Sequence, residues 1–483
     1  MKLSQLLERK DLPRDPEVRG LAYHSQRVQR GDLYIALSGR RHDGHRFLED
    51  ARRRGAVAAL VEHRVPGVDL LQVRVPNTRQ AMARVAARFY GHPSRQLTVI
   101  GITGTNGKTT TAYLLRTLLS LAGRPTGLLS TIEYDLLDRR RMAFLTTPES
   151  VDLQRYLREI LEAGGQAAVM EVSSHGVAEH RIDHIHFRYG VFTNLGRDHL
   201  DYHGSVEQYL EAKLRFVERV ADTLVVNADD PVAPRVIQRS RASRVLTFGR
   251  SERAHLRARI LKNDLFGLDL ELEGILSGRF SSPLPGAYNA DNLMAAFLTF
   301  YAITGETPLA YQEAFRERFT GVPGRFQTLL GRGAPFQVIV DYAHTPDALE
   351  VLHRAVQQLN PRRIITVFGA GGDRDIGKRP LMARTVEQYA DVLVLTSDNP
   401  RSEDPLAIIA DLMEGLEHRG REVHVEPDRR KAIELALNLA EPGDVVILAG
   451  KGHEITQTIQ GQRIPFDDRK VALDILKARG LLP

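Results

Sequence analysis

The chain has 483 residues, more than one hydrophobic core usually serves, so we expect about three domains. Its hydrophobic content of 42% and charged content of 26% are typical of a soluble globular protein, and no run of about 18 apolar residues predicts a membrane span. Cysteine is absent, which excludes disulfides, thiolate catalysis and Cys-ligated metals. Residues 1–10 lack the apolar segment of an export signal, so we expect a cytoplasmic protein.

The net charge of +6 favours anionic partners. Basic residues alternate with acidic ones, and aromatic residues make up only 6%, so a nucleic acid partner is not expected. Nucleotides and carboxylated metabolites fit this charge pattern better.

Residues 1–95 predict an N-terminal mixed α/β domain. The pattern predicts strands at 32–37 and 56–61 and helices at 46–54 and 78–90. The segment Gly91-His92-Pro93-Ser94 is typical of a linker.

Residues 96–322 predict a central domain in which apolar strands alternate with helices. Such strands are typical of a parallel sheet that is buried on both faces. The strands are expected at 97–102, 126–129, 167–172, 190–193 and 223–227. Residues 260–273 alternate like an antiparallel hairpin, with Asn263-Asp264 as the expected turn, and Gly321 to Gly324 is a second candidate linker.

Residues 323–483 predict a second doubly wound, Rossmann-like domain. Its strands are expected at 337–341, 364–368, 392–396, 423–425 and 445–448. In both domains, polar clusters follow the strands, and ligands of such sheets bind beyond the carboxyl ends of the strands.

The segment from Val99 to Thr110, V-I-G-I-T-G-T-N-G-K-T-T, carries the clearest motif. An apolar strand ends in a loop with spaced glycines and leads into a helix, as in a phosphate-binding loop (P-loop). The match to G-x-x-x-x-G-K-[ST] is imperfect, because position 102 is Ile. Lys108 is expected near the β- and γ-phosphates of ATP, and the Thr109 hydroxyl is expected to ligate Mg²⁺.

Further candidates follow the later strands of the central domain. Glu171 ends an apolar strand and suits Mg²⁺, although a buried Glu paired with an Arg is the alternative. His199 lies in a segment rich in His and Asp that suggests a metal or phosphoryl site, or an ordinary polar loop. Lys213, taken alone, is typical of an exposed lysine on a helix.

In the last region, Asp341 ends a strand, where its carboxylate can accept hydrogen bonds from a ribose. Arg374 and Arg401 lie in turns, and paired guanidiniums bind carboxylates through two parallel hydrogen bonds. Glu454 suits an ammonium group, so the set fits an amino acid. Surface salt bridges are the alternative for each of them.

Four segments, taken as an ordered set over essentially the whole chain, resemble the Mur ligase family. They are T-G-T-N-G-K-T-T at 103–110, M-E-V-S-S-H at 170–175, N-L at 194–195 with D-H-L-D-Y-H at 198–203, and D-Y-A-H-T-P at 341–346. The segment Asp398-Asn399-Pro400-Arg401 resembles the family's diaminopimelate recognition motif, whose Arg the lysine-adding members usually lack. The resemblance implies a UDP-binding domain at 1–95, an ATP-binding P-loop domain at 96–322 and an amino-acid-binding domain at 323–483.

The resemblance also implies roles for individual residues. The catalytic set is Lys108, Glu171, His199 and Lys213. The magnesium ligands are Thr109, Glu171, His199 and a carbamylated Lys213. The ATP-binding set is Gly104, Thr105, Asn106, Gly107, Lys108, Thr109, Thr110, Asn289, Asn292, Arg325 and Asp341. The set for the UDP-muramoyl dipeptide is Ser25, Thr146, Thr147, Ser173, Glu179 and Arg181. The diaminopimelate set is Arg374, Asp398, Asn399, Pro400, Arg401, Gly450 and Glu454.

Two positions depart from the family pattern. His24-Ser25-Gln26 stands where Asp-Ser-Arg is frequent, so the charged neighbours of Ser25 are missing. Glu179 stands where Gln is common, which adds a negative charge near an anionic substrate.

The resemblance implies an ATP-dependent amide ligase that acts through an acyl phosphate. It would join meso-2,6-diaminopimelate to UDP-N-acetylmuramoyl-L-alanyl-D-glutamate as a monomer, with the C-terminal domain closing over ATP. The alternatives are a related ligase that adds lysine or another amino acid or acts on folate or a poly-amino acid, and a non-catalytic nucleotide-binding module.

Overall fold

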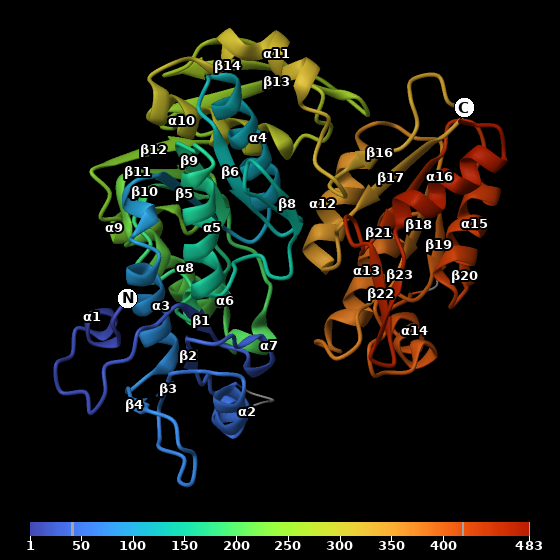
Figure 1. The fold of residues 1–483 in the computed structure, drawn as a ribbon. Helices are drawn as coiled ribbons and strands as arrows, with labels where there is room; N and C mark the ends of the chain where they lie inside the picture. The colour runs from blue at the N-terminus through green and yellow to red at the C-terminus, as the bar shows by residue number, and fades with distance from the viewer. Residues whose placement is uncertain (40–42, 418–419, 483) are drawn as a thin grey trace.

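The computed structural model describes residues 1–39, 43–417 and 420–482, and it is an α/β protein with four β-sheets. Figure 1 shows three bodies along the chain, in blue, in cyan to yellow, and in orange to red. The predicted α/β class with three domains is confirmed, while the boundaries at 95 and 322 stay predictions.

The N-terminal body is a parallel sheet of four strands in the order β1-β2-β3-β4. Its elements are α1 (Leu3–Leu7), β1 (Gly20–Ala22), η1 (Ser25–Arg27), β2 (Asp32–Ile35), η2 (Gly44–Phe47), α2 (Leu48–Arg53), β3 (Ala58–Val61), β4 (Gln72–Arg74) and α3 (Thr78–Phe89). The predicted linker overlaps the short helix η3 (Pro93–Arg95). The strands β2 and β3 are fully buried, as their apolar sequences predict.

The central body is built on an eleven-stranded sheet in the order β15-β14-β13-β12-β11-β10-β5-β9-β6-β7-β8. Its first half comprises β5 (Thr98–Thr103), α4 (Lys108–Leu121), β6 (Thr126–Leu129), β7 (Glu133–Asp135), β8 (Arg140–Met142), α5 (Ser150–Glu162), β9 (Ala167–Glu171), α6 (Ser174–Ala178) and β10 (Phe187–Phe192). Its second half comprises α7 (Leu200–His203), α8 (Val206–Val217), β11 (Val220–Asn227), α9 (Ala233–Arg239), β12 (Arg244–Phe248), β13 (Leu256–Asp264), β14 (Gly267–Gly274), β15 (Gly278–Ser282), α10 (Asn289–Thr304), η4 (Pro308–Tyr311) and α11 (Gln312–Arg318).

The central parallel strands of this sheet are buried on both faces, and successive side chains of each strand point to opposite faces. Ile100 of β5 packs in the core that α4 and α10 cover, whereas its neighbour Val99 packs in the core that α5 and α8 cover. At one edge α11 packs against β15, while the three residues of β8 at the other edge are exposed. The parallel strands that the apolar runs predict are confirmed within a few residues.

The predicted hairpin is present, but its predicted turn is wrong. Asn263 and Asp264 are paired with Leu268 and Gly267 inside the ladder, so the turn falls on residues 265–266. The Asp264 side chain explains the shift, because its Oδ1 accepts a hydrogen bond from the Phe266 N–H at 2.8 Å and thereby closes the turn.

The C-terminal body is a six-stranded sheet in the order β16-β17-β21-β18-β19-β20, in which only the short β16 is antiparallel. Its elements are β16 (Gln327–Thr328), β17 (Gln337–Asp341), α12 (Pro346–Gln357), β18 (Ile364–Phe368), α13 (Lys378–Tyr389), β19 (Val392–Leu395), α14 (Pro405–Met413), β20 (Glu422–Val425), α15 (Arg429–Leu439), β21 (Val445–Ala449) and α16 (Asp468–Ala478). A separate hairpin is formed by β22 (Thr456–Ile459) and β23 (Gln462–Pro465). The predicted doubly wound domain is confirmed.

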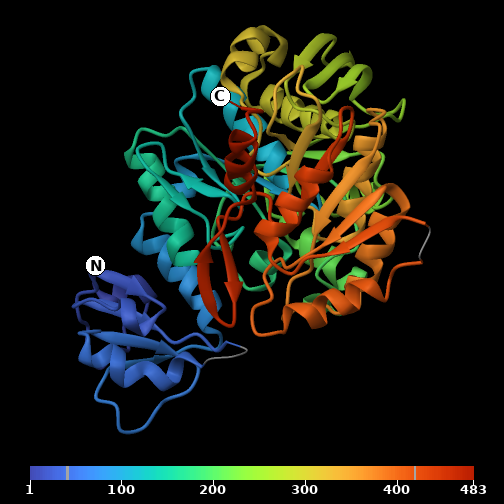
Figure 2. The ribbon, with the colours of Figure 1, turned by 90° about the vertical axis from the view of Figure 1, so that its right-hand side faces the viewer.

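The C-terminal body lies beside the central one, and the N-terminal body is set at the far end of the central one (Figures 1 and 2). Within the described ranges, no single helix has the length and apolar content to cross a membrane. The helical segments Asn289–Thr304 and Pro308–Arg318 together have the length and composition of a membrane span, but they are bent by 103° relative to each other. The first of them, α10, is largely buried in the core.

Candidate active site

A cavity of about 510 Å³ lies between the central and C-terminal bodies. It is bounded by the loops that follow β5 and β9 on one side and by the loop that follows β17 on the other. The predicted site residues that line it are Thr105, Asn106, Gly107, Lys108, Thr109, Thr110, Thr146, Glu171, Ser173, His199, Lys213, Asn289, Asn292, Arg325 and Asp341. The structure therefore brings the predicted ATP and magnesium residues together, at the carboxyl ends of two parallel sheets.

The P-loop, residues 104–107, connects β5 to the first residue of α4. Gly107 has φ +84°, and a Cβ there would lie 2.3 Å from Oδ1 of Asn292, so only glycine fits. Asn194, after β10, accepts the Asn106 N–H on its Oδ1 at 2.9 Å, which fixes the loop. The first N–H groups of α4 have no partner within the helix, so they form an anion site at its N-terminus.

Two lysines converge on the P-loop. The Nζ of Lys108 donates to the carbonyl oxygens of Gly104 at 2.9 Å and Thr105 at 2.7 Å. The Nζ of Lys213 donates to the same Gly104 oxygen at 2.7 Å and lies 4.3 Å from the centre of the Tyr209 ring. Lys213 is only 1% exposed, so its interpretation as an exposed helix lysine is wrong.

Burial and the neighbouring Lys108 cation together hold the pKa of Lys213 well below its ordinary value. Burial also lowers the pKa of Lys108, although the negative charge of Glu171 opposes this shift. A lysine with a depressed pKa is partly neutral, and only the neutral amine can react with CO₂.

Glu171, the last residue of β9, is fully buried. The backbone N–H of Thr131 donates to its Oε1 at 2.8 Å, and the Thr131 hydroxyl bonds its Oε2 at 3.1 Å. In the described part of the chain no cation forms an ion pair with Glu171, so the alternative of a Glu paired with an Arg is wrong. A buried carboxylate needs a compensating charge, and together with the Thr109 hydroxyl it offers the oxygen ligands that Mg²⁺ prefers.

His199 lies in a left-handed conformation, with φ 54°, at the start of α7. Its Nε2 lies 3.4 Å from Oδ2 of Asp198, and its ring meets the His175 ring edge-on at 4.7 Å. Burial lowers the pKa of His199 to about 4 even though the Asp198 charge opposes it. The imidazole is therefore neutral at pH 7, as a metal ligand must be.

The residues predicted for adenine and ribose form a hydrogen-bonded set. Asn292 donates to Asn289 at 2.7 Å, and Asn289 donates to the Pro285 carbonyl at 2.6 Å, which fixes both amides. Asp341 accepts the Phe326 N–H at 2.6 Å, and burial raises its pKa. The Nη2 of Arg325 lies 3.4 Å from the Thr109 hydroxyl, so this arginine connects the C-terminal body to α4.

The residues predicted for the UDP-muramoyl dipeptide are only partly assembled around the cavity. Thr146 and Ser173 line it, and the Thr147 hydroxyl bonds the Ser173 hydroxyl at 3.0 Å. Ser25 is in η1 of the N-terminal body, outside the cavity lining.

The structure explains the unusual Glu179. Its carboxylate pairs with Arg181 at 2.6 Å and with Arg79 of α3 at 3.4 Å. Burial alone would raise the pKa of Glu179, but the two guanidiniums outweigh burial and hold it below its ordinary value. Glu149 bonds the same two arginines, so the extra negative charge is compensated locally.

The residues predicted for diaminopimelate gather after β18, β19 and β21, next to the cavity but outside its lining. Asn399 donates to Asp398 and to Oε2 of Glu454, both at 2.8 Å. Gly450 has φ +108°, and a Cβ there would lie 2.6 Å from Asp398 Oδ2. Pro400 places Arg401 at the start of the neighbouring turn.

Arg401 and Arg374 are two neighbouring cations, and neither forms a salt bridge with a carboxylate of the described residues. Arg401 is half-buried and donates from Nη1 to the Gly372 carbonyl, and Arg374 is exposed. Burial first and the Arg374 charge second lower the pKa of Arg401. The two guanidiniums therefore offer a site for an anionic group.

Sequence reasoning missed several residues of the site. Thr131, in the loop after β6, holds Glu171, but a lone Thr in a loop gives no signal in the sequence. Lys451 is fully buried and pairs with Glu454 at 3.0 Å, so Glu454 is already partly neutralised. The flanking glycines of Gly450-Lys451-Gly452 were the available hint that this lysine lies in a tight turn.

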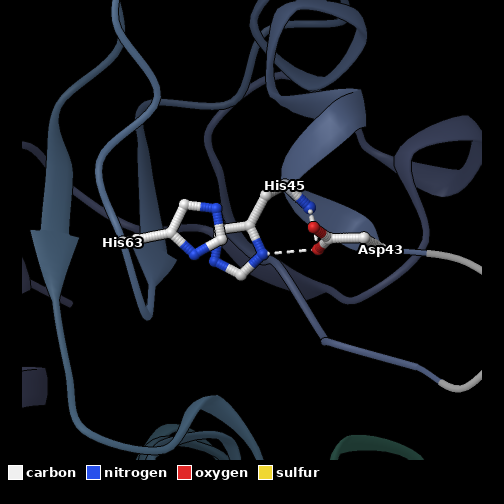
Figure 3. A group of neighbouring side chains, drawn as sticks. All are labelled: Asp43, His45 and His63. Atoms are coloured by element: carbon white, nitrogen blue, oxygen red, sulfur yellow. Dashed lines mark hydrogen bonds and ion pairs between the residues drawn. The ribbon is translucent and has the colours of Figure 1, made fainter.

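A second cluster, in the N-terminal body, joins Asp43, His45 and His63, whose donor atoms lie within 4.8 Å of one another (Figure 3). The Glu62 N–H donates to Nε2 of His45 at 2.9 Å, so Nδ1 carries the proton that bonds Asp43 at 2.6 Å. Both ring nitrogens are thus occupied, and a metal on Nδ1 would require an imidazolate. We interpret this cluster as structural.

Family models match three parts of the chain: "Mur ligase family, catalytic domain" at residues 17–90, "Mur ligase middle domain" at 102–300 and "Mur ligase, glutamate ligase domain" at 324–452. A UDP-N-acetylmuramoyl-L-alanyl-D-glutamate–2,6-diaminopimelate ligase of Solibacter usitatus is 44% identical, with 99% of each chain covered. A ligase of the same name from Aquifex aeolicus is 40% identical over 96% of this chain and 95% of that one. The chain belongs to the Mur ligase family.

Solved structures agree with this assignment. One of a UDP-N-acetylmuramoyl-L-alanyl-D-glutamate–2,6-diaminopimelate ligase has a TM-score of 0.69 and 33% identity, with 99% of each chain covered. The MurF ligase of Thermotoga maritima, solved in complex with ADP, has a TM-score of 0.67 at 19% identity over 95% of this chain and 97% of that one, and it shows the shared fold.

Proposed function

We propose that this protein is an ATP-dependent ligase that joins meso-2,6-diaminopimelate to the D-glutamyl residue of UDP-N-acetylmuramoyl-L-alanyl-D-glutamate. The observation that carries the proposal is the meeting of the P-loop and the Asp341 loop of the C-terminal body around one cavity, at the carboxyl ends of two sheets. Relatives that are 40–44% identical over nearly the whole chain bear the name of this activity.

ATP and Mg²⁺ fit the residues of the cavity. The N-terminus of α4 and Lys108 would hold the β- and γ-phosphates, while Asn289, Asn292, Arg325 and Asp341 would hold adenine and ribose. Thr109, Glu171, His199 and a carbamylated Lys213 would hold magnesium, which supplies neutralisation of phosphate charge. The carbamate forms when the neutral Lys213 nitrogen attacks CO₂ and releases one proton, so that a buried neutral amine becomes an anionic ligand.

The reaction has two steps, and each forms one bond and breaks another. A γ-carboxylate oxygen of the D-glutamyl residue attacks the γ-phosphorus of ATP, and ADP leaves, which gives an acyl phosphate. The amine of diaminopimelate then attacks the acyl carbon, and phosphate and one proton leave. Lys108 and the α4 N-terminus hold the transferring group, and the C-terminal body covers the cavity and excludes water from the acyl phosphate.

The two guanidiniums favour diaminopimelate over lysine. Lysine has one carboxylate, whereas diaminopimelate has two, and Arg374 and Arg401 provide for the additional one. We assign recognition of the amine region to Asp398, Asn399 and Glu454, with Gly450 leaving room beside Asp398. Ser25, Thr146, Thr147, Ser173 and Arg181 would hold the UDP-muramoyl dipeptide, with Glu179 orienting Arg181.

The test is phosphate release from ATP in the presence of the UDP-muramoyl dipeptide, with and without meso-diaminopimelate. We expect release that depends on both substrates, and a product that is heavier by one diaminopimelyl residue by mass spectrometry. Release with L-lysine that equals or exceeds release with diaminopimelate would point to the related ligase instead. The absence of any release, across a range of magnesium and bicarbonate concentrations, would refute the proposal.

A further inference from the structure

A cluster of four charged side chains joins the N-terminal body to the central one. Its members are Arg79 of α3, Glu149 directly before α5, and Glu179 and Arg181 after α6. The Nη1 of Arg79 lies 3.1 Å from Oε2 of Glu149 and 3.4 Å from Oε2 of Glu179. Arg181 contacts the same two carboxylates, with Nε 3.1 Å from Oε1 of Glu149 and Nη2 2.6 Å from Oε2 of Glu179. Cations and anions therefore alternate in a closed ring.

The ring adjoins residues predicted for the UDP-muramoyl dipeptide. The Nη1 of Arg181 donates to the Thr147 carbonyl at 3.1 Å, and the Thr147 hydroxyl bonds the Ser173 hydroxyl at 3.0 Å. Ser173 lines the cavity, and on the side of the N-terminal body α3 packs against α5. The ring thus lies where the two bodies meet, beside the proposed dipeptide site.

The formal charges of the ring sum to zero. Glu149 and Arg181 are buried, while Arg79 and Glu179 are half-buried, so water screens these charges less than charges on the surface. Burial raises the pKa of Glu179, but the charges of Arg181 and Arg79 hold it below its ordinary value. This carboxyl is therefore ionised at neutral pH. Without Arg79 the ring would carry one net negative charge.

A negative ring would oppose the proposed ligand. The UDP-muramoyl dipeptide carries a diphosphate and free carboxylates, and like charges that face each other at a contact are unfavourable. Arg181 balances only one of the two carboxylates of the ring, and its Nη1 and Nη2 are already engaged by Thr147 and Glu179. The second carboxylate therefore needs the guanidinium of Arg79.

We propose that Arg79 is a positioning residue of the UDP-muramoyl dipeptide site, contributed by the N-terminal body. It balances the second carboxylate of the ring, so that the charge of Arg181 remains available to an anionic group of the ligand. It also fixes α3 to the segment that carries Arg181. This inference rests on the proposed function, because the identity of the ligand comes from it.

The experiment measures the dissociation constant of the UDP-muramoyl dipeptide by calorimetry in the absence of ATP, so that no turnover occurs. In Arg79→Met it should rise about tenfold, because a partly buried carboxylate loses a partner beside an anionic ligand. The double variant Arg79→Met with Glu179→Gln removes both charges and should return to within about threefold of the wild type. The dissociation constant of MgADP should change by less than about twofold in each variant.

The double variant separates charge balance from simple attachment of the two bodies. If the ring served attachment alone, loss of both members of a pair would weaken dipeptide binding at least as much as loss of one. Arg158→Met removes an exposed arginine of α5 that pairs with Glu162 at 2.7 Å. It is the matched control and should bind the dipeptide as the wild type does.

If Arg79→Met does not fold, Glu179→Gln tests the same balance. This variant keeps an oxygen that can accept from Arg181 but leaves the ring with a net positive charge, so the dissociation constant should fall about threefold. An unchanged constant in Arg79→Met, a double variant as weak as Arg79→Met, or weaker binding by Glu179→Gln would overturn the inference. A wild-type protein that does not bind the dipeptide would instead refute the proposed function, so the two failures are distinguishable.

Discussion

Replacement of Arg401 by Ala should change the choice of amino acid more than the use of ATP. The Arg401 side chain is half-buried, and its backbone N–H is fixed to the Thr458 carbonyl at 2.9 Å. One guanidinium N–H is already used by Gly372, which leaves the remaining donors for a carboxylate. The proposed contact is therefore a charge-assisted bond made by a preorganised side chain.

The magnitude follows from that geometry. Loss of a hydrogen bond to a charged group costs about 1.5–3 kcal/mol, so the KM for diaminopimelate should rise about 10- to 150-fold in Arg401→Ala. Arg401→Lys keeps the charge but loses the planar fork, and a loss of about 1 kcal/mol, or about fivefold, is expected. The KM for ATP should change by less than about twofold, because Arg401 lies outside the cavity lining.

The assay is phosphate release at saturating ATP and UDP-muramoyl dipeptide, with diaminopimelate and L-lysine titrated separately. Lysine lacks the additional carboxylate, so its kinetics should be nearly unaffected and the discrimination between the two amino acids should collapse. Arg354→Ala, which removes an exposed arginine of α12 paired with Glu350, is the matched control. An unchanged KM for diaminopimelate, or an equal rise for both amino acids, would refute the reasoning.

Three further predictions concern Lys213 beside the P-loop, the pH dependence of stability, and a buried ion pair of the C-terminal body. Lys213→Ala should lose most of kcat and regain part of it with acetate, measured by phosphate release; full activity without acetate would exclude the carbamate. His353 is buried with a pKa lowered by burial to about 4, against about 6.5 when unfolded. The unfolded chain thus binds more protons than the folded protein between these two pH values. The free energy of unfolding should therefore rise from pH 4 to 6.5, by up to about 3 kcal/mol from this group. The variant His353→Gln should flatten the slope of Tm against pH, and an unchanged slope would contradict this. Arg429→Met breaks a fully buried ion pair with Asp468 and should lower the free energy of unfolding in urea by about 3–5 kcal/mol. The double variant Arg429→Met with Asp468→Leu should recover much of that loss. Equal stability of the single and double variants would argue against an uncompensated buried charge.

The sequence predicted the parallel strands well, because a strand that is buried on both faces is a continuous apolar run. The strands β17 and β18 begin and end at the predicted residues. Short or polar strands were missed, since β8 is exposed at every residue and β23 is exposed as well. These strands are specified by pairing with a neighbour, and no hydrophobic periodicity marks them.

The site residues, too, could be predicted only where the signal in the sequence is local. The P-loop and the strand-end Glu171 were found because their motifs are local. The burial of Lys213 was not found, because its partner Gly104 comes near it only through the packing of α8 against β5. Gly101 permits that packing, since a Cβ there would lie 2.5 Å from the Phe216 ring.

The two ends of the eleven-stranded sheet are protected in different ways. An outermost strand presents unpaired backbone N–H and C=O groups, which can recruit a strand of another molecule and start aggregation. The helix α11 covers β15, but β8 has no such cover and instead carries Arg140 and Arg141. Strand addition there would strip water from two guanidiniums, so these arginines act as gatekeepers that keep the largest sheet of the protein from growing between molecules.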